Sequence, residues 1–443
     1  MKKSQFNLFF RDAETNRYVV FNAKSTAMAV ISEDELNLYK KLVLKDFVCD
    51  NQIEKTFLNE LEKGDFIFKD NENEIEVLKY LQKSIQFSQS SLNLTIAPTM
   101  ACNFKCVYCY QGEHNSIEKM DKSIQESIID FIKSKIHKID SLNITWYGGE
   151  PLLAIDIIES LTKKFLDLCK QHKVSYNAGI ITNGYYLNKF NAKKLLDLKI
   201  EMVQITLDGP KDYHDLKRPL KNGHGTFDVI ISNLIEIKEI FNKKISLRIN
   251  TDQYNYEYVE EVINILEDNN LLGYVIPYLG YVDSTNDFYD HKKCLSPEKF
   301  LNVKNQFLHK LYKENYEQTC IDYPKVRLNS CLADSINGYV IDPKGNLTKC
   351  WCDIGHDEYC VGNISDGTIQ FNRLIEYFNY DIFSDDKCKE CNIIPICLGG
   401  CPRRRIDNTY SICNTKKLEV HKAIIKEAKA RDNTLKELYF CDI

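Results

Sequence analysis

The distribution of seventeen cysteines constrains this chain more than any other feature of its sequence. Eleven of them lie between Cys320 and Cys441, and three more lie close together at Cys102, Cys106 and Cys109. Disulfide scaffolds are small and secreted, whereas this chain has 443 residues. In a large cytosolic chain, clustered cysteines more often bind metals or carry out redox chemistry.

The overall composition excludes several classes of protein. A net charge of −5 and a pI near 6.1 provide no global field for a phosphate backbone, so we expect no nucleic-acid partner. No apolar stretch is long enough for a membrane helix, and Arg11 and Asp12 interrupt the apolar run Phe6–Phe10 where a signal peptide would continue. We therefore expect a cytoplasmic protein without a membrane partner.

Strand-like and helix-like segments alternate between residues 91 and 315. The expected strands are 92–97, 143–147, 178–182, 202–207, 245–250 and 274–279. The expected helices are 122–138, 155–171, 189–199, 226–241, 256–269 and 297–315. Repeated βα units predict an α/β fold with a parallel sheet.

The two ends of the chain have different patterns. Residues 1–90 predict a small α+β unit with strands 5–11, 17–22 and 65–69 and helices 33–44, 53–63 and 75–87. Residues 88–91 are a plausible linker. Cysteines dominate residues 316–415, and we expect residues 416–443 to form a helical tail.

Polar and glycine motifs follow several of the expected strands. They are the cysteine trio, Gly148–Pro151, Thr182–Gly184 and Asp208–Pro210. In parallel α/β folds the chemistry gathers at the carboxyl ends of the strands, so these motifs should form one site.

The spacing of Cys102, Cys106 and Cys109 suits a compact metal centre. Thiolates are the soft ligands that Fe–S clusters and zinc require. Three cysteines leave one iron of a four-iron cluster without a protein ligand, and that iron can chelate a small molecule. The alternative is structural zinc with a distant fourth ligand, for which His114 is a candidate.

The trio with an aromatic residue before its last cysteine, Tyr108, followed by Gly-Gly-Glu-Pro, resembles the radical S-adenosylmethionine (SAM) enzymes. The resemblance implies a partial (βα)6 TIM-like barrel and a [4Fe–4S] cluster held by the trio. It also implies SAM on the fourth iron, whose reductive cleavage gives a 5′-deoxyadenosyl radical that abstracts hydrogen. No catalytic residue beyond the cluster is predicted.

The same resemblance implies which residues contact SAM. They are Gly148, Gly149, Glu150, Pro151, Thr182, Asn183, Thr206 and Arg218. Glu150 suits the methionine ammonium, and the two glycines allow a close backbone approach. For Arg218, a contact with a carboxylate and a solvated surface position are both open.

The C-terminal cysteines resemble the SPASM extension of radical SAM enzymes, with paired zinc knuckles as the alternative. The pattern is Cys331, Gly345-x4-Cys350, Cys388-x2-Cys391-x5-Cys397-x3-Cys401 and Cys413. The resemblance assigns one auxiliary [4Fe–4S] cluster to Cys388, Cys391, Cys397 and Cys413. It assigns a second to Cys331, Cys350 and Cys401, making three clusters in all. The fourth ligand of the second is Cys320, Cys352 or Cys360, or an open site for a substrate thiolate.

SPASM enzymes usually modify peptides or proteins. By size and element order, residues 1–90 resemble a winged-helix unit that binds leader peptides, with a structural brace as the alternative. We therefore predict a maturase that forms Cys thioether crosslinks in a precursor peptide and receives electrons from flavodoxin or ferredoxin. Alternatives are a formylglycine-forming sulfatase maturase and a non-catalytic Fe–S or zinc module; no general base is identified.

Overall fold

The computed structural model describes residues 1–42, 44, 51–111, 119–284, 288–313, 323–329, 331–407 and 413–443. Its contacts divide the chain into two compact units. Unit 1 comprises Met1–Phe87, Ile321–Ser335 and Tyr377–Ile443, and unit 2 comprises Ser88–Cys320 and Ile336–Glu376. The functional division predicted at residues 90, 315 and 415 stays a prediction. The candidates His114 and Cys320 lie outside the described residues.

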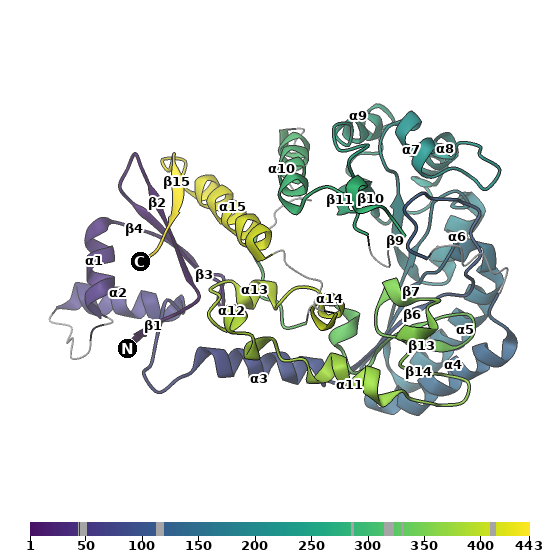
Figure 1. The fold of residues 1–443 in the computed structure, drawn as a ribbon, viewed down its shortest axis with the longest axis horizontal. Coiled ribbons are helices and arrows are strands. Elements are labelled where there is room, and N and C mark those ends of the chain that lie inside the picture. Colours follow the sequence, from purple (N-terminus) through teal and green to yellow (C-terminus); the bar gives the residue numbers. More distant parts are fainter. Residues whose placement is uncertain are drawn as a thin grey trace. The chain divides into compact units, whose positions relative to one another are not determined.

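Unit 2 contains the predicted parallel sheet (Figure 1). Its six βα strands are β6 (Ser91–Ile96), β7 (Ser141–Trp146), β8 (Ser175–Ile181), β9 (Ile200–Thr206), β10 (Ile245–Thr251) and β11 (Val275–Tyr281). They pair in sequence order and all in parallel. The parallel α/β sheet predicted from the alternation is confirmed, and so is the partial barrel that the family resemblance implies.

The helices of unit 2 connect these strands. They are α4 (Lys122–Lys135), α5 (Ile155–His172), α6 (Lys189–Asp197), α7 (Lys211–Lys217), α8 (Phe227–Ile237), α9 (Glu261–Asp268) and α10 (Pro297–Lys313). Because consecutive parallel strands are neighbours, right-handed crossovers place the helices on one face of the sheet. Helix α7 was not predicted, because its seven residues are too short for a clear apolar period.

Strand β10 shows how the sequence separates the two faces of the sheet. Ile245, Leu247 and Ile249 are fully buried in the core of unit 2. Ser246 and Arg248 alternate with them and are more accessible. Successive side chains of a strand point to opposite faces, so Ser246 and Arg248 lie on the inner face, away from the helices.

Residues beyond the predicted barrel extend the same sheet. Strand β12 (Gly338–Ile341) pairs in parallel with β6, and β13 (Asn346–Thr348) and β14 (Gly362–Asn363) continue the sheet antiparallel. The segment expected at 316–415 as one cysteine-rich region is therefore divided between the two units.

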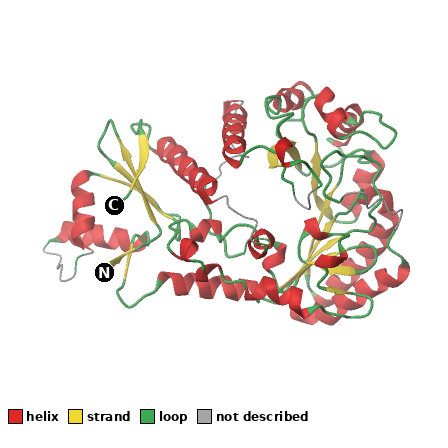
Figure 2. Cartoon of the chain, viewed as in Figure 1, coloured by secondary structure: helices red, strands yellow, loops and turns green. Residues whose placement is uncertain are grey.

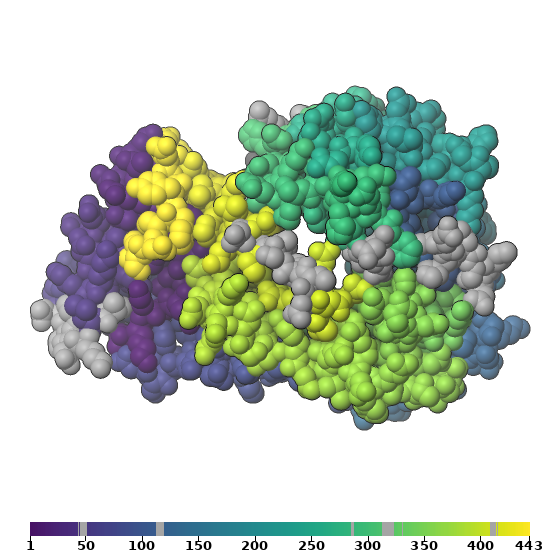
Figure 3. Space-filling model, in the orientation of Figure 1, coloured from purple at the N-terminus to yellow at the C-terminus, as the bar shows by residue number. Residues whose placement is uncertain are grey.

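Unit 1 joins the start and the end of the chain in one antiparallel sheet. Its order is β15 (Leu438–Cys441), β2 (Asn7–Asp12), β3 (Tyr18–Asn22) and β4 (Met28–Ile31). Figure 2 shows these strands in yellow, and Figure 3 shows the last residues packed against the first. The expected helical tail 416–443 is therefore wrong in part, because α15 (Cys413–Arg431) ends before a strand.

Short helices complete unit 1. They are α1 (Glu33–Leu42), α2 (Gln52–Lys63), α3 (Glu74–Gln86), α12 (Asp386–Lys389), α13 (Ile394–Cys397) and α14 (Pro402–Ile406), with the strand pair β1 (Lys2–Lys3) and β5 (Ile67–Phe68). One core contains Phe6 and Phe10 from the N-terminus together with Ile394 and Ile424. In the described residues, no helix has the length and apolar character needed to cross a membrane.

Candidate radical SAM site

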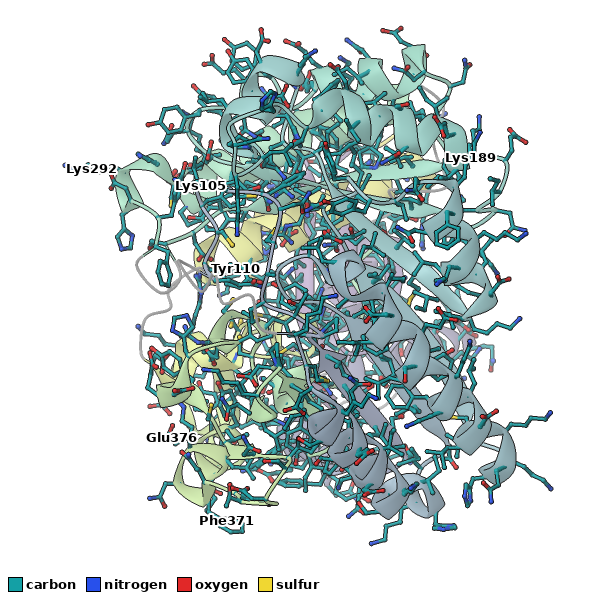
Figure 4. The ribbon with its side chains drawn as sticks, turned by 90° about the vertical axis from the view of Figure 1, so that its right-hand side faces the viewer. Lys105, Tyr110, Lys189, Lys292, Phe371 and Glu376 are labelled. Atoms are coloured by element: carbon teal, nitrogen blue, oxygen red, sulfur yellow. The ribbon has the colours of Figure 1, made fainter. Side chains whose placement is uncertain are left out.

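The loop that carries Cys102, Cys106 and Cys109 is fastened by its backbone. Lys105 N–H donates to Pro219 O at 2.8 Å, Val107 N–H donates to Lys217 O at 3.0 Å, and Lys221 N–H donates to Asn103 O at 3.0 Å. The segment after α7 thus pairs with the loop in the manner of a strand. Figure 4 labels Lys105 and Tyr110 of this loop, well away from Lys189 at the start of α6.

The three thiols lie close enough to affect one another. The pKa of Cys106 is raised to about 12, mainly by burial; Arg218 opposes this shift, and Cys109 and Cys102 contribute to it. Burial also raises the pKa of Cys102 to about 11. A bound cluster would hold these groups as thiolates, since metal ligands must be deprotonated.

The geometry of the trio suits a cluster better than one ion. A single zinc needs its ligands within about 2.3 Å of one point. Within the described ranges, no three Cys, His, Asp or Glu side chains converge on such a point. Three neighbouring soft thiols on one loop, next to a cationic guanidinium, fit an anionic Fe–S cluster.

Gly148 and Gly149 are required by the loop that precedes the cysteines. Gly148 has φ +109°, and a Cβ there would lie 2.4 Å from Thr99 O. A Cβ on Gly149 would lie 2.3 Å from Ala101 O. Gly149 N–H donates to Thr99 O at 3.2 Å and Glu150 N–H donates to Ala101 O at 2.8 Å. Any side chain at either glycine would push the two loops apart.

The structure brings Glu150, Thr182 and Asn183 together, as the sequence predicts for the carboxyl edge. Glu150 is fully buried and accepts from Thr182 Oγ1 at 2.7 Å, Asn183 N at 2.8 Å and Leu152 N at 3.0 Å. Burial raises its pKa, although these hydrogen bonds oppose the shift. Asn183 Nδ2 donates to Asn103 Oδ1 at 2.8 Å, so the carboxylate lies one contact from the cysteine loop.

Pro151 follows Glu150 as the first residue of a short 3-10 helix, Pro151–Ala154, where a missing N–H costs nothing. Thr206 is the last residue of β9 and is 7% exposed. Arg218 is also 7% exposed, which contradicts the solvated surface alternative for this arginine. Their contacts with SAM stay predictions.

Tyr108 is the centre of a network that sequence analysis missed. Its hydroxyl donates to Asp208 Oδ2 and accepts from Arg218 Nη1 at 2.7 Å and from Asn250 Nδ2 at 2.9 Å. Asn250 N–H in turn donates to Asp208 Oδ1 at 3.0 Å. The cysteine loop is thereby joined to the ends of β9 and β10. Its sequence signals are Asp208, two residues after the end of β9, and Asn250, near the end of β10.

Beside this network, His214 holds the α7 segment in place. Its Nδ1 accepts from Asp208 N–H at 3.1 Å, and its Nε2 contacts Thr226 Oγ1 at 3.0 Å. Burial lowers the pKa of His214 well below its usual value, with help from Arg218, so the ring is neutral. Thr226 Oγ1 donates to Arg218 O at 2.8 Å, which fixes the backbone of that arginine.

A buried ion pair lies under Tyr108. Lys217 Nζ is 2.9 Å from Asp252 Oδ2, and the two side chains are 4% and 0% exposed. The same ammonium lies 5.1 Å from the centroid of the Tyr108 ring. The cation therefore compensates Asp252 and contacts the aromatic residue of the cysteine motif.

The four cysteines predicted for one auxiliary cluster all lie in unit 1. Burial raises the pKa of Cys388 and of Cys397, and Cys413 raises both further. Cys391 also raises the pKa of Cys397. The four thiols are therefore near one another. Helix α12 presents Cys388, α13 presents Cys397, and Cys391 lies in the turn between the two helices.

The cysteines predicted for the other auxiliary cluster are divided between the units. Cys331 and Cys401 lie in unit 1, whereas Cys350 lies in unit 2. The neighbouring thiol of Cys352, together with burial, raises the pKa of Cys350 well above its usual value. Cys360 instead donates its thiol to His356 O at 3.7 Å. The fourth ligand stays open between these candidates.

A family model gives the most direct comparison with known proteins. Residues 96–288 match the model described as Radical SAM superfamily. This part of unit 2 is therefore similar to radical SAM domains. Domains of this superfamily use SAM and a [4Fe–4S] cluster, which agrees with the thiols and the carboxylate described above.

Individual relatives extend beyond that domain. The cysteine-type anaerobic sulfatase-maturating enzyme of Clostridium novyi is 24% identical over 72% of this chain and 90% of its own length. Native anSMEcpe with bound AdoMet and Cp18Cys peptide has a TM-score of 0.59 at 21% identity, covering 78% of this chain and all of the other. Streptococcus suis SuiB bound to precursor peptide SuiA has a TM-score of 0.50 at 18% identity, covering 90% and 95%.

Proposed function

We propose that this radical SAM enzyme modifies a ribosomally made peptide. The single observation that carries the chemistry is the gathering of three thiols, Glu150 and Asn183 at the carboxyl edge of the unit 2 sheet. SAM and its cluster supply a 5′-deoxyadenosyl radical there. Glu150 would accept a hydrogen bond from the methionine ammonium of SAM, and the backbone hydrogen bonds between Gly149 and Thr99 and between Glu150 and Ala101 hold this carboxylate beside the cysteine loop.

Two observations support the proposal that the substrate is a peptide: a strand edge in unit 1 and the bound peptides in similar solved structures. Among the described strands, β4 has only one neighbour, β3, so its other edge offers free backbone groups. An extended leader peptide can pair with such an edge. SuiB and anSMEcpe have both been solved with a bound peptide, and their chains align with most of this one.

For the product, we propose a thioether between a substrate Cys and a carbon of the same peptide. Forming this bond removes two hydrogens, one as a hydrogen atom and one as a proton, and leaves one electron to be accepted. The auxiliary-cluster cysteines are the acceptor site this proposal requires, and flavodoxin or ferredoxin is the external electron carrier.

The first experiment tests the radical chemistry. Iron is reconstituted without oxygen, dithionite and SAM are added, and 5′-deoxyadenosine is measured. The Cys102, Cys106 and Cys109 triple alanine variant should form none. A fully loaded wild-type protein that also forms none would favour a non-catalytic module.

A second candidate, formylglycine formation, is favoured by the likeness to the sulfatase-maturating enzyme of Clostridium novyi. Mass spectrometry of a Cys-containing peptide after turnover separates the two products. A thioether lowers the mass by two hydrogens and blocks alkylation of the thiol. Formylglycine loses the sulfur and gains an aldehyde that reacts with a hydrazide probe.

A further inference from the structure

Arg248 presents an unused cation on the inner face of the barrel sheet. It lies on β10, opposite Thr206 of β9 and Tyr278 of β11. Its Nε donates to Asn250 Oδ1 at 2.7 Å. In the part of the chain that the structure describes, no carboxylate forms an ion pair with it. The residue is partly accessible, and Nε is the guanidinium nitrogen with a hydrogen-bond partner among the described residues.

A glycine next to Arg248 leaves space for its guanidinium. Gly280 of β11 lies beside it, and a Cβ there would be 2.5 Å from Arg248 Nε and 2.6 Å from its Cζ. Any larger residue at 280 would occupy the place of the guanidinium. The adjacent Tyr278 is also polar, and its hydroxyl donates to Gln204 Oε1 at 2.7 Å.

Two hydrogen bonds connect Arg248 to the cysteine loop. Asn250 accepts from Arg248 Nε through its oxygen and donates to the Tyr108 hydroxyl through its nitrogen, at 2.7 and 2.9 Å. Burial raises the pKa of Tyr147 well above its usual value, Cys352 and Cys109 raise it further, and Arg248 opposes them. The cation therefore lies near Tyr147, as Cys109 does, and is connected to the cysteine loop through Asn250.

We propose that Arg248 binds a carboxylate of the peptide substrate, that of an Asp or Glu close to the residue that is modified. The proposal rests on the peptide-modifying function above and names its substrate class. A planar guanidinium held at Nε still offers Nη1 and Nη2, which match the two oxygens of a carboxylate. SAM also carries a carboxylate, on its methionine part, that Arg248 could bind. The experiment must therefore distinguish a peptide carboxylate from that of SAM.

The test uses pairs of short fluorescein-labelled peptides that contain one Cys and differ only in Glu or Gln at one position. Binding to the reconstituted protein is followed by fluorescence anisotropy without oxygen. The wild-type protein should bind the Glu peptide at least about tenfold more tightly, as a charge-assisted pair requires. Arg248→Gln should abolish the difference, and Arg248→Lys should retain only part of it, because lysine lacks the fork.

Two further variants serve as a second test and as a control. Gly280→Ala keeps every charge but displaces the guanidinium, so it should also reduce the preference for the Glu peptide. If Arg248→Gln does not fold, Gly280→Ala tests the proposal instead. Arg373→Gln removes a partly buried arginine paired with Glu376 at 2.6 Å, elsewhere in unit 2, and should leave the preference intact. Far-UV circular dichroism and iron content report folding of each variant.

Three outcomes would overturn the inference. They are equal binding of both peptides by the wild type, a preference that survives in Arg248→Gln, and a loss confined to SAM affinity in that variant. The last would assign Arg248 to the SAM carboxylate. If the wild type still forms 5′-deoxyadenosine, the inference alone fails; if it forms none, the proposed function fails.

Discussion

Replacing Glu150 by glutamine tests the buried carboxylate at the centre of the site. The variant keeps the shape of the side chain but places an amide where Thr182 Oγ1 and Asn183 N–H both donate, at 2.7 and 2.8 Å. One of these donors then faces an NH2 group. The ammonium of SAM also loses its anionic partner. A charge-assisted hydrogen bond contributes about 1.5–3 kcal/mol, so the Kd for SAM should rise about 10- to 150-fold.

The pH dependence of SAM affinity is a second test of the role predicted for Glu150. Burial raises the pKa of Glu150 above its ordinary 4.5. The ionised form binds the ammonium, so the affinity of the wild type should fall as pH decreases through this raised pKa. Glu150→Gln has no ionisable group there and should lack this dependence.

Isothermal titration calorimetry of the anaerobic, reconstituted protein measures both effects. The control is Glu159→Gln, which removes a carboxylate on α5 paired with Lys163 and Lys194 at 2.7 and 2.6 Å. It should leave SAM affinity unchanged. A Kd for Glu150→Gln within twofold of wild type, with the pH dependence retained, would refute the role given to this carboxylate.

Three other perturbations have defined outcomes. Lys217→Met leaves Asp252 buried without its cation and should lower the free energy of unfolding by about 3–5 kcal/mol in urea denaturation; the double variant with Asp252→Asn should recover part of it. Tyr108→Phe removes a hydroxyl with three partners and should cost about 1–3 kcal/mol in the same assay, and an unchanged midpoint would contradict the network. Cys397→Ala should reduce bound iron by one cluster of three, whereas Cys441→Ala should not.

The sequence predicted the barrel well because its signals are local. Each of the six strands is a short apolar run between helical segments, and all six were found within a few residues of their expected positions. Strand β15 was missed because its partner, β2, lies at the opposite end of the chain. The parallel pairing of β12 with β6 was missed for the same reason.

The site was predictable only where motifs mark it. Glu150 and Asn183 follow strand ends in recognisable patterns, and the structure joins them by a hydrogen bond of 2.8 Å. Arg248 is one polar residue inside an otherwise alternating strand, so its sequence pattern predicts only an inner-face position. Its significance depends on Gly280 and Asn250, whose proximity comes from strand register.

The pairing of β15 with β2 has a consequence for biosynthesis. The last residue needed for unit 2, Glu376, leaves the ribosome well before residues 438–441. Unit 2 can therefore reach its native state during translation, since domains generally fold as they emerge. In the sheet of unit 1, the edge of β2 that pairs with β15 stays uncovered until residues 438–441 have been synthesised. A truncation just before residue 438 should thus expose β2 to aggregation while sparing the barrel.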